Sequence, residues 1–240
     1  MSNARFSFAL AGGKLCYALC KMIAPKRGSN LPGAVALKLD PGFLRHVKGL
    51  DPATTIFITG TNGKSTANNM IVHAFLTAGH SVCSNIEGAN MKAGIASALL
   101  KNTSAGGRFK REYLILEVDE RSLARVAEEI KPGHLCVTNI QKDQVQRNGD
   151  PDYIYQKIKG VVEKTDSLTL YVNNDEPRSK SLGNSLAEDS RVISFGVMQN
   201  SRGSEPEPGW EVTMPCPLCH DALSFAWYNL AGVGAFSCAA

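Results

Sequence analysis

Residues 59–66, which read TGTNGKST, constrain the fold of this chain more than any other segment. They follow an apolar run at residues 54–58 and precede a helical pattern at residues 66–78. A strand, a glycine loop and a helix in this order form the context of a phosphate-binding loop. Gly60 and Gly63 allow backbone N–H groups to turn toward phosphate oxygens, and the helix adds the positive end of its dipole. The segment therefore predicts a nucleotide site.

The side chains of this loop have distinct expected roles. Lys64 is expected to reach the β- and γ-phosphates, and the Ser65 hydroxyl to bind Mg²⁺. The strict motif has glycine six residues before the lysine, where this chain has Ile58, so the loop is a variant. A glycine turn without a ligand is the alternative, but strand, Gly-Lys-Ser and helix coincide here. The remaining expected nucleotide contacts are Gly60, Thr61, Asn62, Gly63 and Thr66.

Composition limits the other classes of function. A net charge of +4 over 240 residues is too small to indicate a nucleic-acid partner. The apolar stretch near the N-terminus is interrupted by Gly12, Gly13 and Lys14, so we expect no transmembrane segment and a cytoplasmic protein. Residues 1–30 predict a basic amphipathic helix, either docked on the main domain or in contact with an anionic membrane surface.

Strand-like and helical patterns alternate along the rest of the chain. This alternation predicts an α/β fold with a parallel sheet covered by helices on both faces. We expect an N-terminal segment at 1–50, a nucleotide-binding domain at 51–200 and a linker with a small cysteine module at 201–240. The expected strands are 54–58, 80–83, 113–118, 135–140, 168–172 and 192–195, and the expected helices are 65–78, 90–101, 121–130 and 152–164.

Two strand ends carry polar side chains, and ligands bind at such ends in parallel sheets. Glu117, Asp119 and Glu120 follow one apolar run, and a carboxylate there is suited to holding Mg²⁺ near a γ-phosphate. We expect Glu117 to be the Mg²⁺ ligand. Glu120 is better explained as a solvent-exposed residue at the end of the strand. After another run, Asn139 and Asp143 are expected to face the same cleft, with Asp143 near the nucleotide.

The cysteines indicate a metal site rather than a disulfide framework. There are seven, an odd number, and Cys216, Cys219 and Cys238 cluster near the C-terminus. Their spacing is that of a Zn²⁺ ribbon whose fourth cysteine would fall at position 241, beyond Ala240. His220 is the alternative fourth ligand, although adjacent residues rarely converge on one tetrahedral ion. The other alternative is a chance cysteine pair without a metal.

With these residues in view, the chain resembles the Mur ligase superfamily, ATP-dependent amide-forming enzymes of cell-wall synthesis. Residues 59–66 are similar to the ATP loop of that superfamily. The narrower resemblance is to its MurT branch, the catalytic subunits of lipid II isoglutaminyl synthase. This match rests on residues 31–41, 85–96, 117–120 and 138–144, together with the cysteine ribbon.

The resemblance implies the amidation of the D-glutamate of lipid II. ATP activates the α-carboxylate as an acyl phosphate, and ammonia displaces the phosphate to leave D-isoglutamine. A GatD-type glutaminase subunit supplies the ammonia from glutamine, and the lipid-linked substrate places the protein at the inner membrane face. In this scheme Lys64 and Glu117 are catalytic, and Ser65 and Glu117 serve Mg²⁺.

The resemblance also leaves alternatives. Lys157 and Lys159 are both candidates for the carbamylated lysine of many Mur ligases. The superfamily's C-terminal domain, which closes over ATP, is absent, so a truncated chain is expected. The alternatives are another Mur-like ligase, such as a folylpolyglutamate synthase, and a truncated non-catalytic protein that binds ATP and zinc.

Overall fold

The computed structural model describes residues 2–23, 30–86, 90–141, 150–197, 214–229 and 233–239, and all structural statements refer to these. Six strands form one sheet in the order β2-β3-β1-β4-β5-β6, and β7 and β8 form a separate antiparallel pair. The pairs β1–β3, β2–β3 and β5–β6 are parallel. The strands are β1 (Thr55–Thr59), β2 (Val82–Ser84), β3 (Tyr113–Glu117), β4 (His134–Val137), β5 (Thr169–Asn173), β6 (Arg191–Phe195), β7 (Ser224–Asn229) and β8 (Val233–Ser237).

The expected α/β fold is confirmed, since each predicted strand of the sheet has an observed counterpart. The four predicted helices of the nucleotide-binding domain correspond to α4, α5, α6 and α8, and the N-terminal helix to α1. The helices are α1 (Ser2–Ile23), α2 (Leu31–Leu39), α3 (Phe43–His46), α4 (Lys64–Thr77), α5 (Lys92–Lys101), α6 (Glu120–Ala127), α8 (Pro151–Val162) and α9 (Pro177–Ser181), with 3₁₀ turns at Pro52–Thr54 and Leu182–Ser185.

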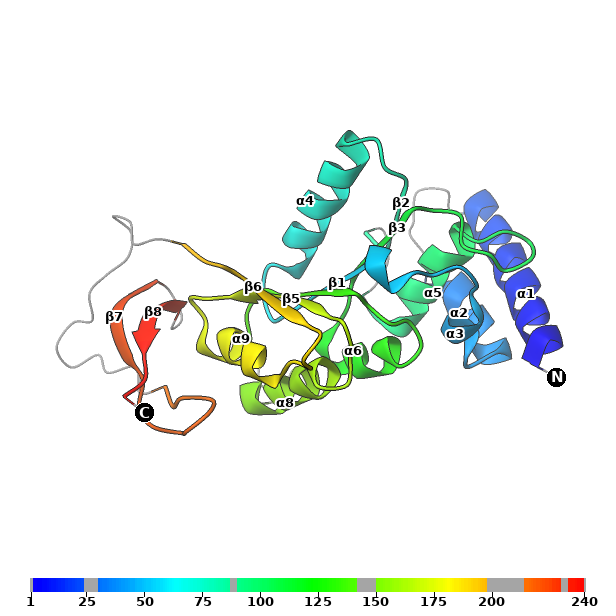
Figure 1. Ribbon diagram of the computed structural model, residues 1–240. Helices are drawn as coiled ribbons and strands as arrows, with labels where there is room; N and C mark the ends of the chain where they lie inside the picture. Colours follow the sequence, from blue (N-terminus) through cyan, green and yellow to red (C-terminus); the bar gives the residue numbers. More distant parts are fainter. Residues whose placement is uncertain are drawn as a thin grey trace. The chain divides into compact units, whose positions relative to one another are not determined.

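The chain divides into two compact units, one formed by residues 1–59 and 63–135 and the other by residues 60–62 and 136–240. In the first unit, Leu114, Ile115 and Leu116 of β3 are almost fully buried. In Figure 1, α4 lies on one face of β1 and β3, while α5 and α6 lie on the other. Burial on both faces explains the continuous apolar run in the sequence.

Helix α2 begins at Leu31, so the loop that Pro25 to Pro32 favour in the sequence does not extend over Leu31 and Pro32. Pro32 stands at the first helical positions, where its missing N–H costs nothing. Gly33 is required by packing, since a Cβ there would lie 2.0 Å from the Ala93 carbonyl oxygen of α5. Its N–H donates to Ser97 Oγ at 2.8 Å. The glycine marks a close contact between two helices and not a turn.

Helix α1 corrects the expectation that no apolar run is long enough to cross a membrane. Residues Ala4–Ile23 meet the length and composition of a membrane span. Core helices and signal sequences meet the same test, so this property alone decides nothing. In the structure, Phe6, Ala9 and Leu10 of α1 are buried.

In the second unit, β5 and β6 run parallel over five paired positions. Helix α8 buries Ile154, Tyr155 and Ile158. Helix α9 begins at the buried carboxylate of Glu176, which accepts N–H bonds from Arg178 and Ser179. The predicted domain boundaries near residues 50 and 200 remain predictions, and the first part of the predicted linker, residues 201–213, lies outside the described residues.

Candidate functional site

The loop between β1 and α4 presents an open helix N-terminus. Gly60 and Gly63 have positive φ angles of +123° and +81°, which glycine adopts without strain. Gly63 occupies the N-cap of α4, no side chain caps the helix, and its first turn contains no acidic residue. Ser65 and Thr66 are exposed in that turn. The backbone N–H groups there are arranged as an anion site requires.

The first half of the loop is held by the residues that follow β4. The Asn62 N–H donates to Asn139 Oδ1 at 3.0 Å, and Asn139 Nδ2 donates to the Asn62 carbonyl oxygen at 3.0 Å. Thr138 Oγ1 donates to the same carbonyl oxygen at 2.7 Å. The Thr61 N–H donates to the Asn139 carbonyl oxygen at 2.8 Å. The Asn139 side chain therefore holds both backbone polar groups of Asn62.

These hydrogen bonds give Asn139 a different role from the expected one, which was to face a cleft beside Asp143. Asn139 is a positioning residue for the loop, and Asp143 lies outside the described residues. The signal in the sequence was the apolar run that ends immediately before Thr138 and Asn139. At the end of a strand beside a glycine loop, an asparagine side chain can donate to and accept from the backbone of one loop residue.

Replacing Asn139 with alanine is expected to weaken Mg·ATP binding about tenfold, because two hydrogen bonds that shape the loop are lost. Isothermal titration calorimetry measures the affinity. Asn102→Ala is the matched control, since Asn102 stands at the C-terminal end of α5 and its Nδ2 donates to the Ala98 carbonyl oxygen at 3.0 Å. Equal affinities for Asn139→Ala and the wild type would contradict the positioning role.

Lys64 and Glu120 form a buried ion pair at the start of α4. Lys64 Nζ lies 2.7 Å from Glu120 Oε1, and their side chains are 12% and 4% exposed. Burial raises the pKa of Glu120, and the hydrogen bond and charge of Lys64 oppose that rise. The expectation that Glu120 is a solvated strand end is wrong. The sequence shows an acidic cluster there, but it does not show that α6 begins at Glu120 and turns its carboxylate inward.

Glu117 is held by two asparagines that were not predicted as site residues. Asn85 makes two hydrogen bonds with the Glu117 backbone, from Nδ2 to the carbonyl oxygen at 2.8 Å and from the Glu117 N–H to Oδ1 at 3.0 Å. Asn90 Nδ2 donates to Glu117 Oε1 at 3.2 Å. The Asp119 N–H donates to the Asn90 carbonyl oxygen at 2.9 Å.

The three carboxylates at the C-terminal end of β3 and just beyond it thus have three different surroundings. Glu120 pairs with Lys64, Asp119 caps α6 by accepting the Arg121 N–H at 3.0 Å, and Glu117 remains half-buried beside Asn90. Glu117 is the member suited to Mg²⁺, because its oxygens are hard donors and its backbone is fixed on both sides. Ser65 offers a hydroxyl in the exposed first turn of α4. The oxygen donor set fits Mg²⁺.

Both lysines considered for carbamylation lie on α8. Lys157 Nζ lies 5.2 Å from the centre of the Tyr153 ring. Lys159 Nζ lies 3.2 Å from Glu163 Oε1 on the next turn of the helix. Both side chains have ordinary surface partners, and the two remain alternatives.

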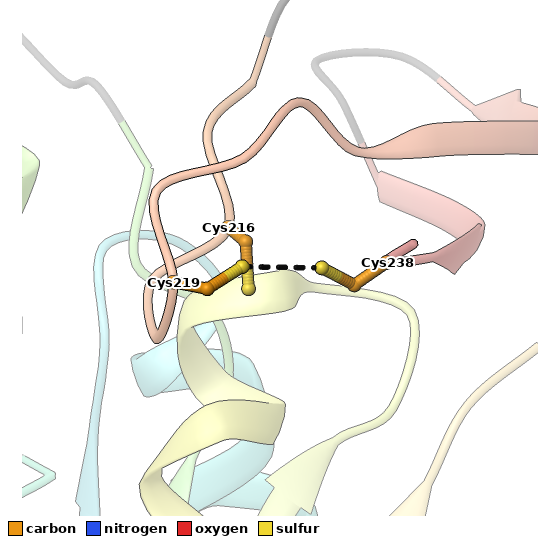
Figure 2. A group of neighbouring side chains, drawn as sticks. All are labelled: Cys216, Cys219 and Cys238. Carbon is orange, nitrogen blue, oxygen red and sulfur yellow. Dashed lines mark hydrogen bonds between the residues drawn. The ribbon is translucent and has the colours of Figure 1, made fainter. Parts of the chain in front are cut away.

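Cys216, Cys219 and Cys238 converge in the second unit. Figure 2 shows their side chains pointing toward one another, and all three sulfur atoms lie within 4.8 Å of each other. Cys219 Sγ and Cys238 Sγ are 3.3 Å apart. Hydrogen bonds from the Cys219 and Leu218 N–H groups lower the pKa of Cys216, which favours a thiolate. Sulfur separations of about 3.8 Å follow from tetrahedral bonds of ~2.3 Å, so this set fits Zn²⁺. The alternative ligand His220 is not part of the cluster.

Replacing Cys238 with serine is expected to lower zinc affinity at least a hundredfold. Structural zinc sites bind with roughly 10–16 kcal/mol, so the loss of one of the three clustered thiol ligands should remove a few kcal/mol of that affinity. Competition with a chromogenic chelator measures the affinity. Cys20→Ser is the control, because Cys20 lies on α1 near Cys16 and outside the cluster. An unchanged zinc affinity for Cys238→Ser would exclude the ribbon.

A family model described as the Mur ligase middle domain matches residues 58–208 of the chain. The MurT subunit of glutamine-hydrolysing lipid II isoglutaminyl synthase from Staphylococcus aureus (strain COL) is 31% identical over 214 residues, 89% of this chain and 46% of that protein. The MurT subunit from Streptococcus pneumoniae (strain ATCC BAA-255 / R6) is 28% identical over 243 residues, 98% of this chain and 51% of that protein. A UDP-N-acetylmuramate–L-alanine ligase from Mycobacterium avium (strain 104) is 26% identical over 205 residues, 83% of this chain and 39% of that protein. The chain spans about half the length of the MurT proteins it matches.

Solved structures show the same fold at low sequence identity. MurF from Acinetobacter baumannii matches with a TM-score of 0.52 and 16% identity, over 68% of this chain and 35% of that chain. MurF ligase from Thermotoga maritima in complex with ADP matches with a TM-score of 0.52 and 17% identity, over 69% and 36%. These likenesses concern the fold alone.

Proposed function

Because the chain belongs to the Mur ligase middle domain family, we propose that it is the ATP-binding part of a carbon–nitrogen ligase of peptidoglycan synthesis. The proposed type is lipid II isoglutaminyl synthase, the activity named for the MurT relatives. The substrate is the α-carboxylate of D-glutamate in lipid II. The product is the corresponding amide, D-isoglutamine, and the nitrogen comes from glutamine.

The chemistry explains why such a reaction needs ATP. A carboxylate is a poor electrophile, because its leaving group would be an oxide. Transfer of the γ-phosphoryl group to a carboxylate oxygen gives an acyl phosphate and ADP. Ammonia then attacks the carbonyl carbon, the bond to the phosphorylated oxygen breaks, and phosphate leaves as the nitrogen loses a proton. One ATP is consumed for each amide formed.

The residues of the loop are suited to the first of these steps. Backbone N–H groups at the N-terminus of α4 bind phosphate oxygens, and the Lys64 ammonium balances charge on the transferred group. Glu120 holds Lys64 in one orientation through a 2.7 Å contact. Asn139 keeps the backbone of Asn62 in place, because its side-chain oxygen and nitrogen bind the Asn62 N–H and carbonyl oxygen.

Ser65 and Glu117 would hold Mg²⁺, with Asn85 and Asn90 orienting Glu117. When bound, Mg²⁺ neutralises phosphate charge and so lets a carboxylate approach. The cysteine cluster would hold Zn²⁺ as a structural ion, since its donors are all cysteine sulfurs and the proposed reaction uses none of these residues.

The proposed partner is a glutaminase subunit of the GatD type, which supplies ammonia in a heterodimer. This part of the proposal is supported by the names of the MurT relatives, which are subunits of a glutamine-hydrolysing enzyme. Lipid II places the reaction at the inner face of the membrane, with the protein in the cytoplasm.

The observation that carries the proposal is the Lys64–Glu120 pair at the uncapped N-terminus of α4 in a chain of this family. The test uses the complete reading frame with the glutaminase subunit, ATP, glutamine and lipid II. Mass spectrometry should detect the mass decrease that accompanies exchange of a carboxyl hydroxyl for an amino group. Lys64→Ala in the same complex should prevent this decrease.

Two controls separate the ways in which this test can fail. Supplying ammonia directly bypasses the glutaminase, so amidation with ammonia but not with glutamine would contradict only the partnership. Binding of ATP without any amide product under both conditions would favour a non-catalytic ATP- and zinc-binding protein and overturn the ligase.

A further inference from the structure

Helix α1 carries a continuous stripe of exposed apolar side chains. Their spacings of seven, four, three and one residues place all of them on one face of an α-helix. Within the described part of the chain, no neighbour covers this face, which we call the α1 stripe. Its members are Phe8 (72% exposed), Leu15 (63%), Leu19 (50%), Met22 (81%) and Ile23 (84%).

The opposite side of α1 is packed against the first unit. Phe6 contacts Phe43 of α3, with ring centres 5.4 Å apart. A Cβ on Gly13 would lie 2.8 Å from Leu100 Cδ1 of α5, and a Cβ on Gly12 would lie 2.9 Å from Leu39 Cδ1 of α2. These glycines bring α1 close to its neighbours. In Figure 1, α1 lies along the edge of the first unit beside α2. A helix packed along one side and apolar along the other is suited to lie on a membrane rather than to cross it.

The N-terminal segment that carries the stripe has a strong excess of positive charge. In residues 1–50, eight lysines and arginines stand against the single carboxylate of Asp40, which gives a formal net charge of +7. Because the whole chain carries +4, residues 51–240 carry −3. Asp40 is 3% exposed, and its Oδ2 lies 2.7 Å from His46 Nδ1, so it does not offset the positive surface. The exposed basic residues of this segment are Arg5, Lys21, Lys38, Arg45 and Lys48.

We propose that the α1 stripe and these basic residues form a docking surface for an anionic membrane, with α1 lying in the interfacial plane. Apolar side chains enter the acyl boundary, and exposed cations of the same segment meet lipid phosphates. A second copy of the chain would bring together two N-terminal segments that each carry a formal charge of +7, which charge repulsion disfavours. The same positive surface complements anionic lipid. The proposal rests on this N-terminal segment alone and stands independently of ligase activity.

The test measures co-sedimentation of the full chain with vesicles of phosphatidylglycerol and phosphatidylcholine in equal amounts, without nucleotide or lipid II. Wild-type protein should bind, and the triple variant Leu15→Gln, Leu19→Gln, Met22→Gln should bind about a hundredfold less. The double variant Lys21→Gln, Lys38→Gln should bind about thirtyfold less. On pure phosphatidylcholine this charge variant should match the wild type.

Matched controls show whether the loss of binding is specific to the α1 stripe. Met70→Gln, Leu76→Gln removes exposed apolar side chains from α4 and should leave vesicle binding unchanged. Circular dichroism verifies that each variant is folded, and all substituted side chains are exposed. Failure of the wild type to bind vesicles, or equal binding by the stripe variant, would overturn the proposal. So would a stripe variant whose only change is from dimer to monomer in sedimentation analysis, since that would identify a second copy as the occupant.

Discussion

Gly60→Ala is expected to weaken Mg·ATP binding more than about a hundredfold and to destabilise the protein by about 3–5 kcal/mol. A Cβ at this position would lie 2.3 Å from Thr138 Oγ1, 2.8 Å from the Asn139 carbonyl oxygen and 3.0 Å from the Asn139 nitrogen. The last two are backbone atoms, so no rotamer change relieves the clash. The φ angle of +123° adds strain for any other residue. Calorimetric titration and urea unfolding measure the two effects.

Gly63→Ala is the matched control in the same loop. Its φ angle is +81°, but nothing lies within 4 Å of an added Cβ. The cost is therefore backbone strain of about 1–2 kcal/mol. The substitution also keeps the N–H group, so most of the nucleotide affinity should remain. Similar losses in both variants would show that strain alone, and not the contact with residues 138 and 139, makes Gly60 necessary.

The sheet could be predicted from the sequence because central strands such as β3 are buried on both faces, although the edge strand β6 is exposed. Leu114, Ile115 and Leu116 form an uninterrupted apolar run, and the structure begins β3 at Tyr113 as predicted. The starts of several helices could also be predicted from the sequence. Gly63 precedes α4, and Asp119 and Asp150 cap α6 and α8. These signals are local, and the surrounding structure agrees with them.

The parts that were missed depend on contacts between distant residues. Pro32 and Gly33 are local signals for a turn, but the close approach of α5 gives them a helical role. Glu120 was predicted to be exposed because acidic side chains usually face solvent. Its burial is explained by its contact with Lys64, which lies 56 residues earlier in the sequence. Asn85 and Asn90 act on Glu117 across 32 and 27 residues, and no spacing rule predicts such pairs.

Lys64→Ala is expected to weaken Mg·ATP binding by a factor of about 10 to 150, which corresponds to roughly 1.5–3 kcal/mol for a charge-assisted phosphate contact. It should also destabilise the protein by about 2–3 kcal/mol, because Glu120 is left as a buried charge without its cation. Lys92→Ala is the control. Lys92 forms a comparable half-buried pair with Glu129, away from the loop, so its loss should affect stability and leave nucleotide affinity unchanged.

The double variant Lys64→Ala, Glu120→Gln separates the two roles of Lys64. Removing the buried charge should restore most of the stability, but the phosphate contact stays lost and the affinity for ATP should not recover.

The pH dependence of stability gives an independent check. Without Lys64, the pKa of Glu120 should rise further, because burial raises it and the hydrogen bond and charge of Lys64 are the largest effects that oppose the rise. A glutamate whose pKa is raised in the folded state stabilises the protein at pH values below the ordinary glutamate pKa. This stabilisation is lost as the pH rises through the raised pKa. The stability difference between Lys64→Ala and the wild type should therefore shrink as the pH falls, whereas the double variant has no ionisable group at position 120 and its stability should show no contribution from titration there. If ATP affinity returned in the double variant, Lys64 would serve only to neutralise Glu120, and the phosphate contact would have to come from the backbone of α4.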